Sequence, residues 1–284
     1  MLAWETGSKD RKACFDRMTA SQPRRSDIAI PTTDDMFLGE TLSILQPRKG
    51  YRAGIDAVLL AAAVPSIAEP SQRILDLGAG VGVVGLSVAA RLSNASVTLL
   101  EHQESLVSLA CQNVERNGLS ERVNVQWHDI VGTGSEGVAP ELYDYALANP
   151  PFYEPSSVRL PPNEIKSKAH VMSAGDLDAW FRLMAHALKP GGIAMLIHRV
   201  EALPELLQFA ESRFGALEIQ PIHPFADQPA NRMLLKGKKG SRKPLNLLPG
   251  IVIHRSDRSY QPDIEKVLRS PTGLCCAESV RLSS

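Results

Sequence analysis

The sequence predicts an α/β fold in which a mainly parallel sheet carries helices on both faces. Short apolar runs alternate with segments whose apolar residues repeat at helical spacing, which is typical of βαβ units. A glycine-rich stretch, Gly78–Gly85, directly follows the first run and indicates a strand-to-helix turn. Right-handed crossovers bring the carboxyl ends of parallel strands to one edge, where ligands bind in such sheets.

The elements follow from these runs in chain order. Strands are expected at Ile74–Leu77, Val97–Leu100, Val123–Trp127, Tyr145–Ala148, Ile193–Ile197, Leu217–Ile222, Met233–Lys236 and Ile251–His254. Helices are expected at Gly85–Leu92, Glu104–Asn117, Leu177–Leu188 and Glu201–Phe214. The triplet Pro190-Gly191-Gly192 is expected to stop the third helix.

The chain outside this pattern is expected to divide into shorter parts. Residues 1–35 mix charges, Ser, Thr and Pro and are expected to form a flexible extension. Residues 36–70 are expected to pack on the main domain, residues 71–260. Residues 261–284 are expected to be a tail, with one helical turn at Ile264–Leu268.

Composition narrows the class of protein. The 284 residues are 44% hydrophobic, and 31 Lys and Arg balance 31 Asp and Glu, which disfavours coating nucleic acid or membrane through bulk charge. No apolar run reaches the ~18–20 residues of a membrane helix. The four cysteines, Cys14, Cys111, Cys275 and Cys276, form no CxxC pair and no cluster with His. We therefore expect no metal site and a reducing, cytoplasmic compartment.

The glycine stretch indicates a nucleotide-like cofactor. Residues Gly80–Gly85 spell G-x-G-x-x-G, and Glu101 ends the next expected strand, where a carboxylate suits ribose hydroxyls. These two features fit both NAD and S-adenosylmethionine. Asp76 precedes the glycines, and its carboxylate would repel a pyrophosphate but attract a sulfonium and an ammonium group. Asp129 ends the third expected strand and could accept a hydrogen bond from an adenine amino group.

With these residues in this order, the segment from about Ile74 to His198 resembles the class I S-adenosylmethionine-dependent methyltransferases. The resemblance implies a Rossmann-like fold with a mainly parallel seven-stranded sheet, S-adenosylmethionine as cofactor, and residues 71–260 as the methyltransferase domain. It implies that Gly78, Gly80 and Gly82 let the cofactor approach the loop. Asp76 would support its methionine end, Glu101 its ribose and Asp129 its adenine.

The tetrad Asn149-Pro150-Pro151-Phe152 follows the fourth expected strand at the same edge. The Asn149 side-chain oxygen and the Pro150 carbonyl can both accept hydrogen bonds from a planar amino group, which orients its lone pair. Proline makes this arrangement rigid, and Phe152 offers a face for stacking. The tetrad resembles the (Asn/Asp)-Pro-Pro-(Phe/Tyr) motif of enzymes that methylate planar amino nitrogens.

The flanks of the motifs narrow the substrate. The segments Gly50–Leu60 and Pro229–Gly240 resemble the bacterial tRNA1(Val) adenine N6-methyltransferase family, which modifies the adenine beside the anticodon. The resemblance implies tRNA as partner and no membrane partner, and it extends from about Phe37 to His254. It also makes Arg52 and Asp56 candidate cofactor contacts. For Asp56, an alternative of equal weight is that it forms the N-cap of a helix at Ala57–Val64.

Basic residues near the end of the chain are candidates for contacting RNA phosphates, although a solvated basic hairpin is the alternative. No acidic residue lies among Arg232, Lys236, Lys238, Lys239, Arg242 and Lys243. Lys166 and Lys168, after the tetrad, are further candidates, and His170 is a less favoured general base.

Other functions fit the same sequence features. The same motifs occur in protein glutamine N5-methyltransferases of the release-factor type and in ribosomal RNA and DNA amino-methyltransferases. A non-catalytic RNA-binding protein that retains the fold and a nicotinamide oxidoreductase are the alternatives from other classes. The sequence does not indicate the oligomeric state.

Overall fold

The structure is a computed structural model, and it describes residues 30–50, 52–66, 71–151 and 174–274. A nine-stranded sheet has the order β10-β8-β9-β7-β6-β3-β4-β5, with β11 paired to β8. Its strands are β3 Arg73–Leu77, β4 Ser96–Glu101, β5 Val123–Trp127, β6 Tyr143–Ala148, β7 Leu188–Arg199, β8 Phe214–His223, β9 Arg232–Lys239, β10 Asn246–Leu247 and β11 Ile251–Val252.

Seven longer strands, β3 to β9, form the centre of this sheet, in agreement with the mainly parallel seven-stranded sheet that the family resemblance implies. All neighbours pair in parallel except β9, which lies antiparallel between β7 and β8. The two-residue strands β10 and β11 extend the sheet beside β8. The chain runs from β3 outward through β4 to β5 and then returns to β6 on the other side of β3. This reversal between β3 and β6 is the switch point at which α/β sheets bind ligands.

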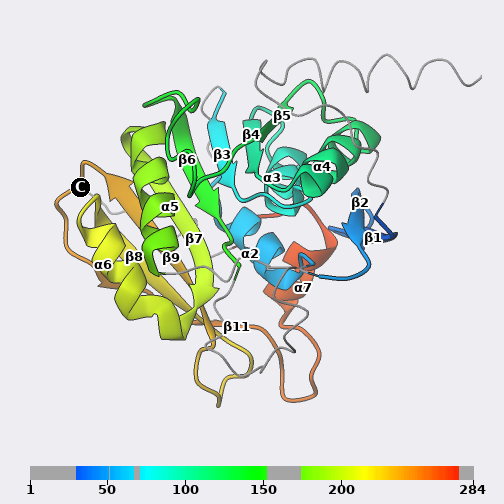
Figure 1. The fold of residues 1–284 in the computed structure, drawn as a ribbon. Coiled ribbons are helices and arrows are strands. Elements are labelled where there is room, and N and C mark those ends of the chain that lie inside the picture. The colour runs from blue at the N-terminus through cyan, green and yellow to red at the C-terminus, as the bar shows by residue number, and fades with distance from the viewer. Residues whose placement is uncertain (1–29, 51, 67–70, 152–173, 275–284) are drawn as a thin grey trace, which may run out of the picture.

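Helices cover both faces of the sheet (Figure 1). One face packs against α2 Ile55–Ala63, α3 Val83–Arg91, α4 Glu104–Arg116 and α7 Pro262–Arg269, and the other face packs against α5 Ala174–Ala187 and α6 Leu203–Glu211. Seven consecutive residues of α2 are buried, because α3, α7 and β7 surround this helix. Such burial contributes about 2 kcal/mol for each leucine side chain.

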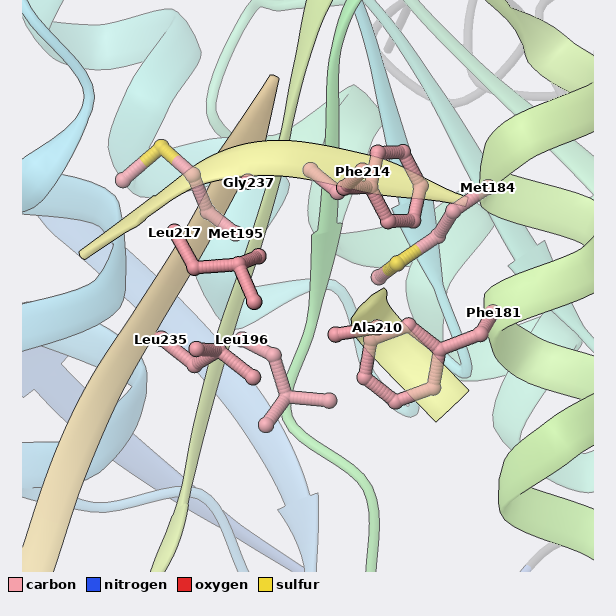
Figure 2. A pocket seen from close by; sticks show the side chains of 10 residues that line it. Phe181, Met184, Met195, Leu196, Ala210, Phe214, Leu217, Leu235 and Gly237 are labelled. Atoms are coloured by element: carbon pink, nitrogen blue, oxygen red, sulfur yellow. The ribbon is translucent and has the colours of Figure 1, made fainter. Parts of the chain in front are cut away.

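The packing of α5 and α6 on the sheet leaves a small apolar gap. Figure 2 shows Phe181 and Met184 of α5 beside Phe214 and Leu217 of β8, with apolar side chains on every side. The space for a water-sized sphere is about 10 Å³, which barely suffices for one water molecule. This gap is a packing defect of the core and cannot hold a cofactor.

An N-terminal hairpin packs on α3 and α4 and forms a sheet of its own. It consists of β1 Thr32–Phe37 and β2 Leu42–Pro47, which pair antiparallel. The expected boundary at residue 35 therefore falls inside a strand, and residues 1–29 lie outside the described residues. The hairpin turn packs on the end of α7, because a Cβ at Gly39 would lie 1.9 Å from the Arg269 carbonyl oxygen.

Two expected boundaries differ from the structure. Helix α5 ends at Ala187, and Pro190-Gly191-Gly192 lies within β7 instead of stopping the helix. The register with β6 shifts at this point, and Gly192 lies too close to the Lys189 and Asp144 carbonyls for a free side chain. The expected helix Glu201–Phe214 is shorter, since it consists of a 3₁₀ turn at Val200–Ala202 followed by α6, with Pro204 in its first turn.

The end of the chain also differs from the expected tail. Helix α7 buries Ile264 and Val267. Beyond it, the Leu274 backbone N–H donates to the Ala62 carbonyl at 2.9 Å. Residues 261–274 are therefore packed on α2, and residues 275–284 lie outside the described residues.

No helix in the described ranges could cross a bilayer. The longest, α5, has 14 residues, whereas a membrane-spanning helix needs about 20.

The packing of α7 predicts a stability contribution from the expected tail. Replacing the buried Ile264 by alanine should lower the free energy of unfolding by about 2–4 kcal/mol, because it leaves a cavity against α2. Lys266→Ala, on the exposed face of the same helix, is the control and should change it by less than about 0.5 kcal/mol. Urea denaturation measures both, and equal small effects would show that α7 is not part of the cooperative fold.

Candidate active site

Three neighbouring strands end side by side at the switch point. Leu77 of β3 pairs with Leu100 of β4 and with Ala148 of β6. The next residues along each strand are Gly78, Glu101 and Asn149. The register therefore brings the glycine loop, the acidic residue and the start of the tetrad together at one edge of the sheet.

The three glycines of the loop have different surroundings, although all have positive φ angles of 58–92°. A Cβ at Gly78 would lie 2.3 Å from the indole ring of Trp180 on α5. Gly82 forms the N-cap of α3, where a Cβ would lie 3.0 Å from Leu99. Gly80 alone of the three has no atom within 4 Å of its Cβ position, so open space lies beside its backbone. Gly80 is thus the position where a ligand can approach the loop most closely.

Asp76 lies under the loop and is 1% exposed. One of its carboxylate oxygens accepts a hydrogen bond of 2.9 Å from the Gly85 backbone N–H in the first turn of α3. Burial raises the pKa of the Asp76 carboxyl to about 7, and the nearby Glu101 adds to the increase, while the Gly85 bond opposes it. A cation near this carboxyl would favour its ionised form.

Glu101 organises the loop from the other side. Its two carboxylate oxygens accept bonds of 2.8–2.9 Å from the backbone N–H groups of Gly80, His102 and Gln103. Burial acts to raise the pKa of the Glu101 carboxyl, but the His102 side chain and these N–H groups outweigh it, and the pKa lies below its ordinary value. The structure thus holds an ionised carboxylate beside the open space at Gly80.

Asp129 lies two residues beyond the end of β5 and is half-buried. One side-chain oxygen accepts bonds from the Val131 and Gly132 backbone N–H groups at 3.1 and 3.0 Å. These bonds shape the turn that follows the strand. The contact of Asp129 with adenine stays a prediction.

The tetrad begins directly at the end of β6. Asn149 is 9% exposed and Pro150 is buried, whereas Pro151 is exposed. Phe152 lies outside the described residues. Asn149 therefore lies at the edge of the site, beside Gly78, which directly follows the neighbouring strand β3.

Arg52 and Asp56 form ion pairs within the chain. Arg52 donates to Asp35 of β1 at 2.6 Å. Asp56 accepts a bond of 3.1 Å from Arg232 at the start of β9. Gly54 is the N-cap residue of α2, so the N-cap alternative for Asp56 is wrong. The cofactor contacts implied for Arg52 and Asp56 stay predictions.

The expected basic patch is divided by the fold. Arg232, Lys236 and Lys239 pair with Asp56, Glu218 and Glu141 at 3.1, 3.9 and 3.2 Å. Lys238, Arg242 and Lys243 are exposed.

The position of these basic residues along the sheet also matters. Lys238 pairs with Ile193, six residues before Arg199 at the carboxyl end of β7. This separation corresponds to about 20 Å along the strand, so Lys238 and the following residues lie toward the edge opposite Asn149. Their contact with RNA stays a prediction. Lys166, Lys168 and His170 lie outside the described residues.

Two residues that contact the loop were not identified from the sequence as parts of a site. Trp180 falls within the expected helix Leu177–Leu188, and its ring lies against Gly78. Asn113 is fully buried and donates to the Val81 carbonyl at 3.0 Å. The available clue was a polar residue on the apolar face of α4, three residues after Ala110 and one before Val114.

The described residues contain no group of three His, Cys, Asp or Glu side chains that could hold a metal ion. The site instead offers a loop with an open backbone approach, an ionised Glu101 and a buried Asp76. These features fit the ribose and the cationic methionine end of S-adenosylmethionine.

Comparisons with known proteins indicate the family of this chain. A sequence profile of the methyltransferase small domain matches residues 55–177. A tRNA1(Val) (adenine(37)-N6)-methyltransferase from Dickeya chrysanthemi is 24% identical over 82% of this chain and 92% of its own length. A protein of the same name from Dyadobacter fermentans is 30% identical over 62% of this chain and 68% of its own length.

Two further relatives carry other names. A release factor glutamine methyltransferase from Gloeobacter violaceus is 30% identical, over 51% of this chain and 52% of its own length. The crystal structure of a predicted O-methyltransferase from Agrobacterium tumefaciens has a TM-score of 0.63 and 29% identity, covering 77% of this chain and 97% of that one.

The fold and these matches define a class I methyltransferase that uses S-adenosylmethionine. Within that class, the chain belongs to the methyltransferase small-domain family.

The different surroundings of the glycines predict different effects of alanine. Gly78→Ala should destabilise the fold, because its methyl group would overlap the Trp180 ring. Gly80→Ala should cost only about 1–2 kcal/mol of stability, from its positive φ, but should weaken the binding of S-adenosylhomocysteine by at least about tenfold. Thermal denaturation and calorimetry measure these effects. Unchanged affinity in Gly80→Ala would contradict a cofactor position at this residue.

The pKa of Asp76 predicts a pH-dependent stability. Between pH 3.8 and about 7 the folded chain holds a proton on this carboxyl that the unfolded chain releases. The free energy of unfolding of the wild-type chain, relative to Asp76→Asn, should therefore fall as pH rises through this window and level off above it. Urea denaturation at several pH values measures the difference, and a constant difference would show that Asp76 titrates normally.

Proposed function

We propose that this methyltransferase modifies the exocyclic N6 amino group of an adenine in tRNA, of the tRNA1(Val) type, beside the anticodon. The observation that carries the proposal is the position of Asn149 and Pro150 at the end of β6, beside the glycine loop. The names of the relatives from Dickeya chrysanthemi and Dyadobacter fermentans support the choice of tRNA.

The cofactor would be held by the loop and its two acidic neighbours. The backbone at Gly80 would lie along it, Glu101 would hold the ribose hydroxyls, and Asp76 would favour the cationic methionine end. Asp129 would accept a bond from the adenine amino group. When bound, S-adenosylmethionine supplies an electrophilic methyl group on a positively charged sulfur.

The residues of the tetrad would prepare the nucleophile. The amino group of adenine is a poor nucleophile, because its lone pair is delocalised into the ring. The Asn149 side-chain oxygen and the Pro150 carbonyl would accept hydrogen bonds from its two N–H groups. These bonds would favour the pyramidal form of the amino group, with the lone pair directed at the methyl group. Pro150 is buried, which restricts this segment before the base arrives. Positioning of the reacting groups would then provide most of the rate enhancement. The amino proton would leave to water.

Asn149→Ala tests this assignment. Methyl transfer to tRNA should fall by more than about tenfold, or about 1.4 kcal/mol in the activation barrier, because one of the two acceptors is lost. The affinity for S-adenosylhomocysteine should change little. Transfer of tritium from labelled cofactor measures the rate, and calorimetry measures the affinity. Asn246→Ala, on the exposed strand β10, is a matched control. Full activity of Asn149→Ala would remove Asn149 from the mechanism.

Glutamine N5 methylation of a protein is the second candidate, favoured by the relative from Gloeobacter violaceus. Its planar amide nitrogen would suit the same two acceptors. The purified enzyme and labelled cofactor are added to an extract of a deletion strain. Tritium should then enter tRNA under the first proposal and protein under the second. Mass spectrometry of tRNA nucleosides from the same strain should show the loss of N6-methyladenosine. Labelled protein with unchanged nucleosides would overturn the first proposal.

A further inference from the structure

Helix α4 and its C-cap residue direct two carboxamide side chains, four residues apart, at the free edge of β2. Asn113 accepts a bond from the Leu45 N–H at 2.8 Å and donates to the Leu45 carbonyl at 3.1 Å. Asn117 binds the N–H and the carbonyl of Ser43 in the same way, with both distances at 2.9 Å. The two side chains therefore replace a neighbouring strand and fasten the β1–β2 hairpin to α4.

Asn113 makes one bond to the site for which Asn117 has no counterpart. Its side-chain nitrogen also donates to the Val81 carbonyl at 3.0 Å, and the whole residue is buried. The three bonds engage both the oxygen and the nitrogen of the carboxamide. Leu45, Asn113 and Val81 come from a strand, a helix and a loop that are far apart in sequence.

Val81 lies at the centre of the loop, in a backbone turn that the Gly82 N–H closes by donating to the Ala79 carbonyl at 2.8 Å. It lies between Gly80 and Gly82, and both glycines have positive φ angles. Glycine loses more conformational freedom on folding than any other residue, so bonds from outside the loop add to its own turn in restraining these positions. Glu101 holds the N–H of Gly80, and Asn113 holds the carbonyl of the next residue. The open approach at Gly80 is thus restrained from both sides.

We propose that Asn113 is a positioning residue for the cofactor, which fixes the Val81 carbonyl and links the β1–β2 hairpin to the glycine loop. Loss of the link leaves the loop free to sample other backbone conformations, so the cofactor must order it on binding. The proposal depends on S-adenosylmethionine as cofactor and is independent of the macromolecule that is methylated.

The matched pair Asn113→Ser and Asn117→Ser tests the proposal. Both variants lose two bonds to the hairpin and one further bond. Asn113→Ser loses the bond to the Val81 carbonyl, whereas Asn117→Ser loses a bond of 2.7 Å within the end of α4, to the Asn113 carbonyl. By calorimetry, S-adenosylhomocysteine should bind at least about tenfold more weakly to Asn113→Ser and within about twofold of wild type to Asn117→Ser. In methyl transfer, Asn113→Ser should raise the KM for the cofactor and leave kcat nearly unchanged.

Two results would overturn the proposal. Unchanged affinity in Asn113→Ser, together with a lowered melting temperature, would assign the residue to fold stability alone. Equal losses of affinity in both variants would assign the effect to the fastening of the hairpin rather than to the Val81 bond.

Hydrogen exchange in the wild-type chain decides the question if Asn113→Ser does not fold. Addition of S-adenosylhomocysteine should slow exchange in the loop, in the part of α4 around Asn113 and in β2. Protection of the loop with unchanged exchange in α4 and β2 would contradict a link through Asn113.

Discussion

Two buried carboxylates hold the backbone on which the cofactor site depends. Glu101 binds the N–H of Gly80, and Asp76 binds the N–H of Gly85, so the loop and the start of α3 are fixed to the ends of β4 and β3. A glycine loop without such bonds would have no single shape, since its residues have little steric preference. The rest of the site is arranged around this constraint.

The same two carboxyl groups differ in how readily they ionise. Glu101 is stabilised as an anion by His102 and backbone N–H groups, whereas burial keeps Asp76 easy to protonate near neutral pH. The Glu101 charge is permanent, whereas the Asp76 charge is favoured by a nearby cation. This pair suits a ligand that has hydroxyl groups at one part and a positive charge at another. The parallel register then places Asn149 on the opposite side of β3 from Glu101.

The fold also uses charged residues that the sequence assigns to ligands. Arg232 and Asp56 pair with each other across 176 positions and join β9 to α2 near the carboxyl edge of the sheet. Lys236 and Lys239 likewise have carboxylate partners from other strands or loops. A run of basic residues in sequence therefore overestimates the positive charge available to a nucleic acid, because neighbouring elements neutralise part of it.

Local sequence patterns were sufficient to predict the order of strands and helices from β3 to β9, the glycine loop and the position of Asn149 after a buried strand, but not the β1–β2 hairpin. These features depend on local periodicity and on residue types that are adjacent in the chain. Three contacts are seen only in the folded chain: Trp180 lies on Gly78, Asn113 binds Val81, and α7 packs on α2. Such contacts depend on strand register and helix packing between distant segments, which local patterns do not encode. The same reason explains why Pro190-Gly191-Gly192, typical of a helix end, lies within a strand whose pairing shifts there.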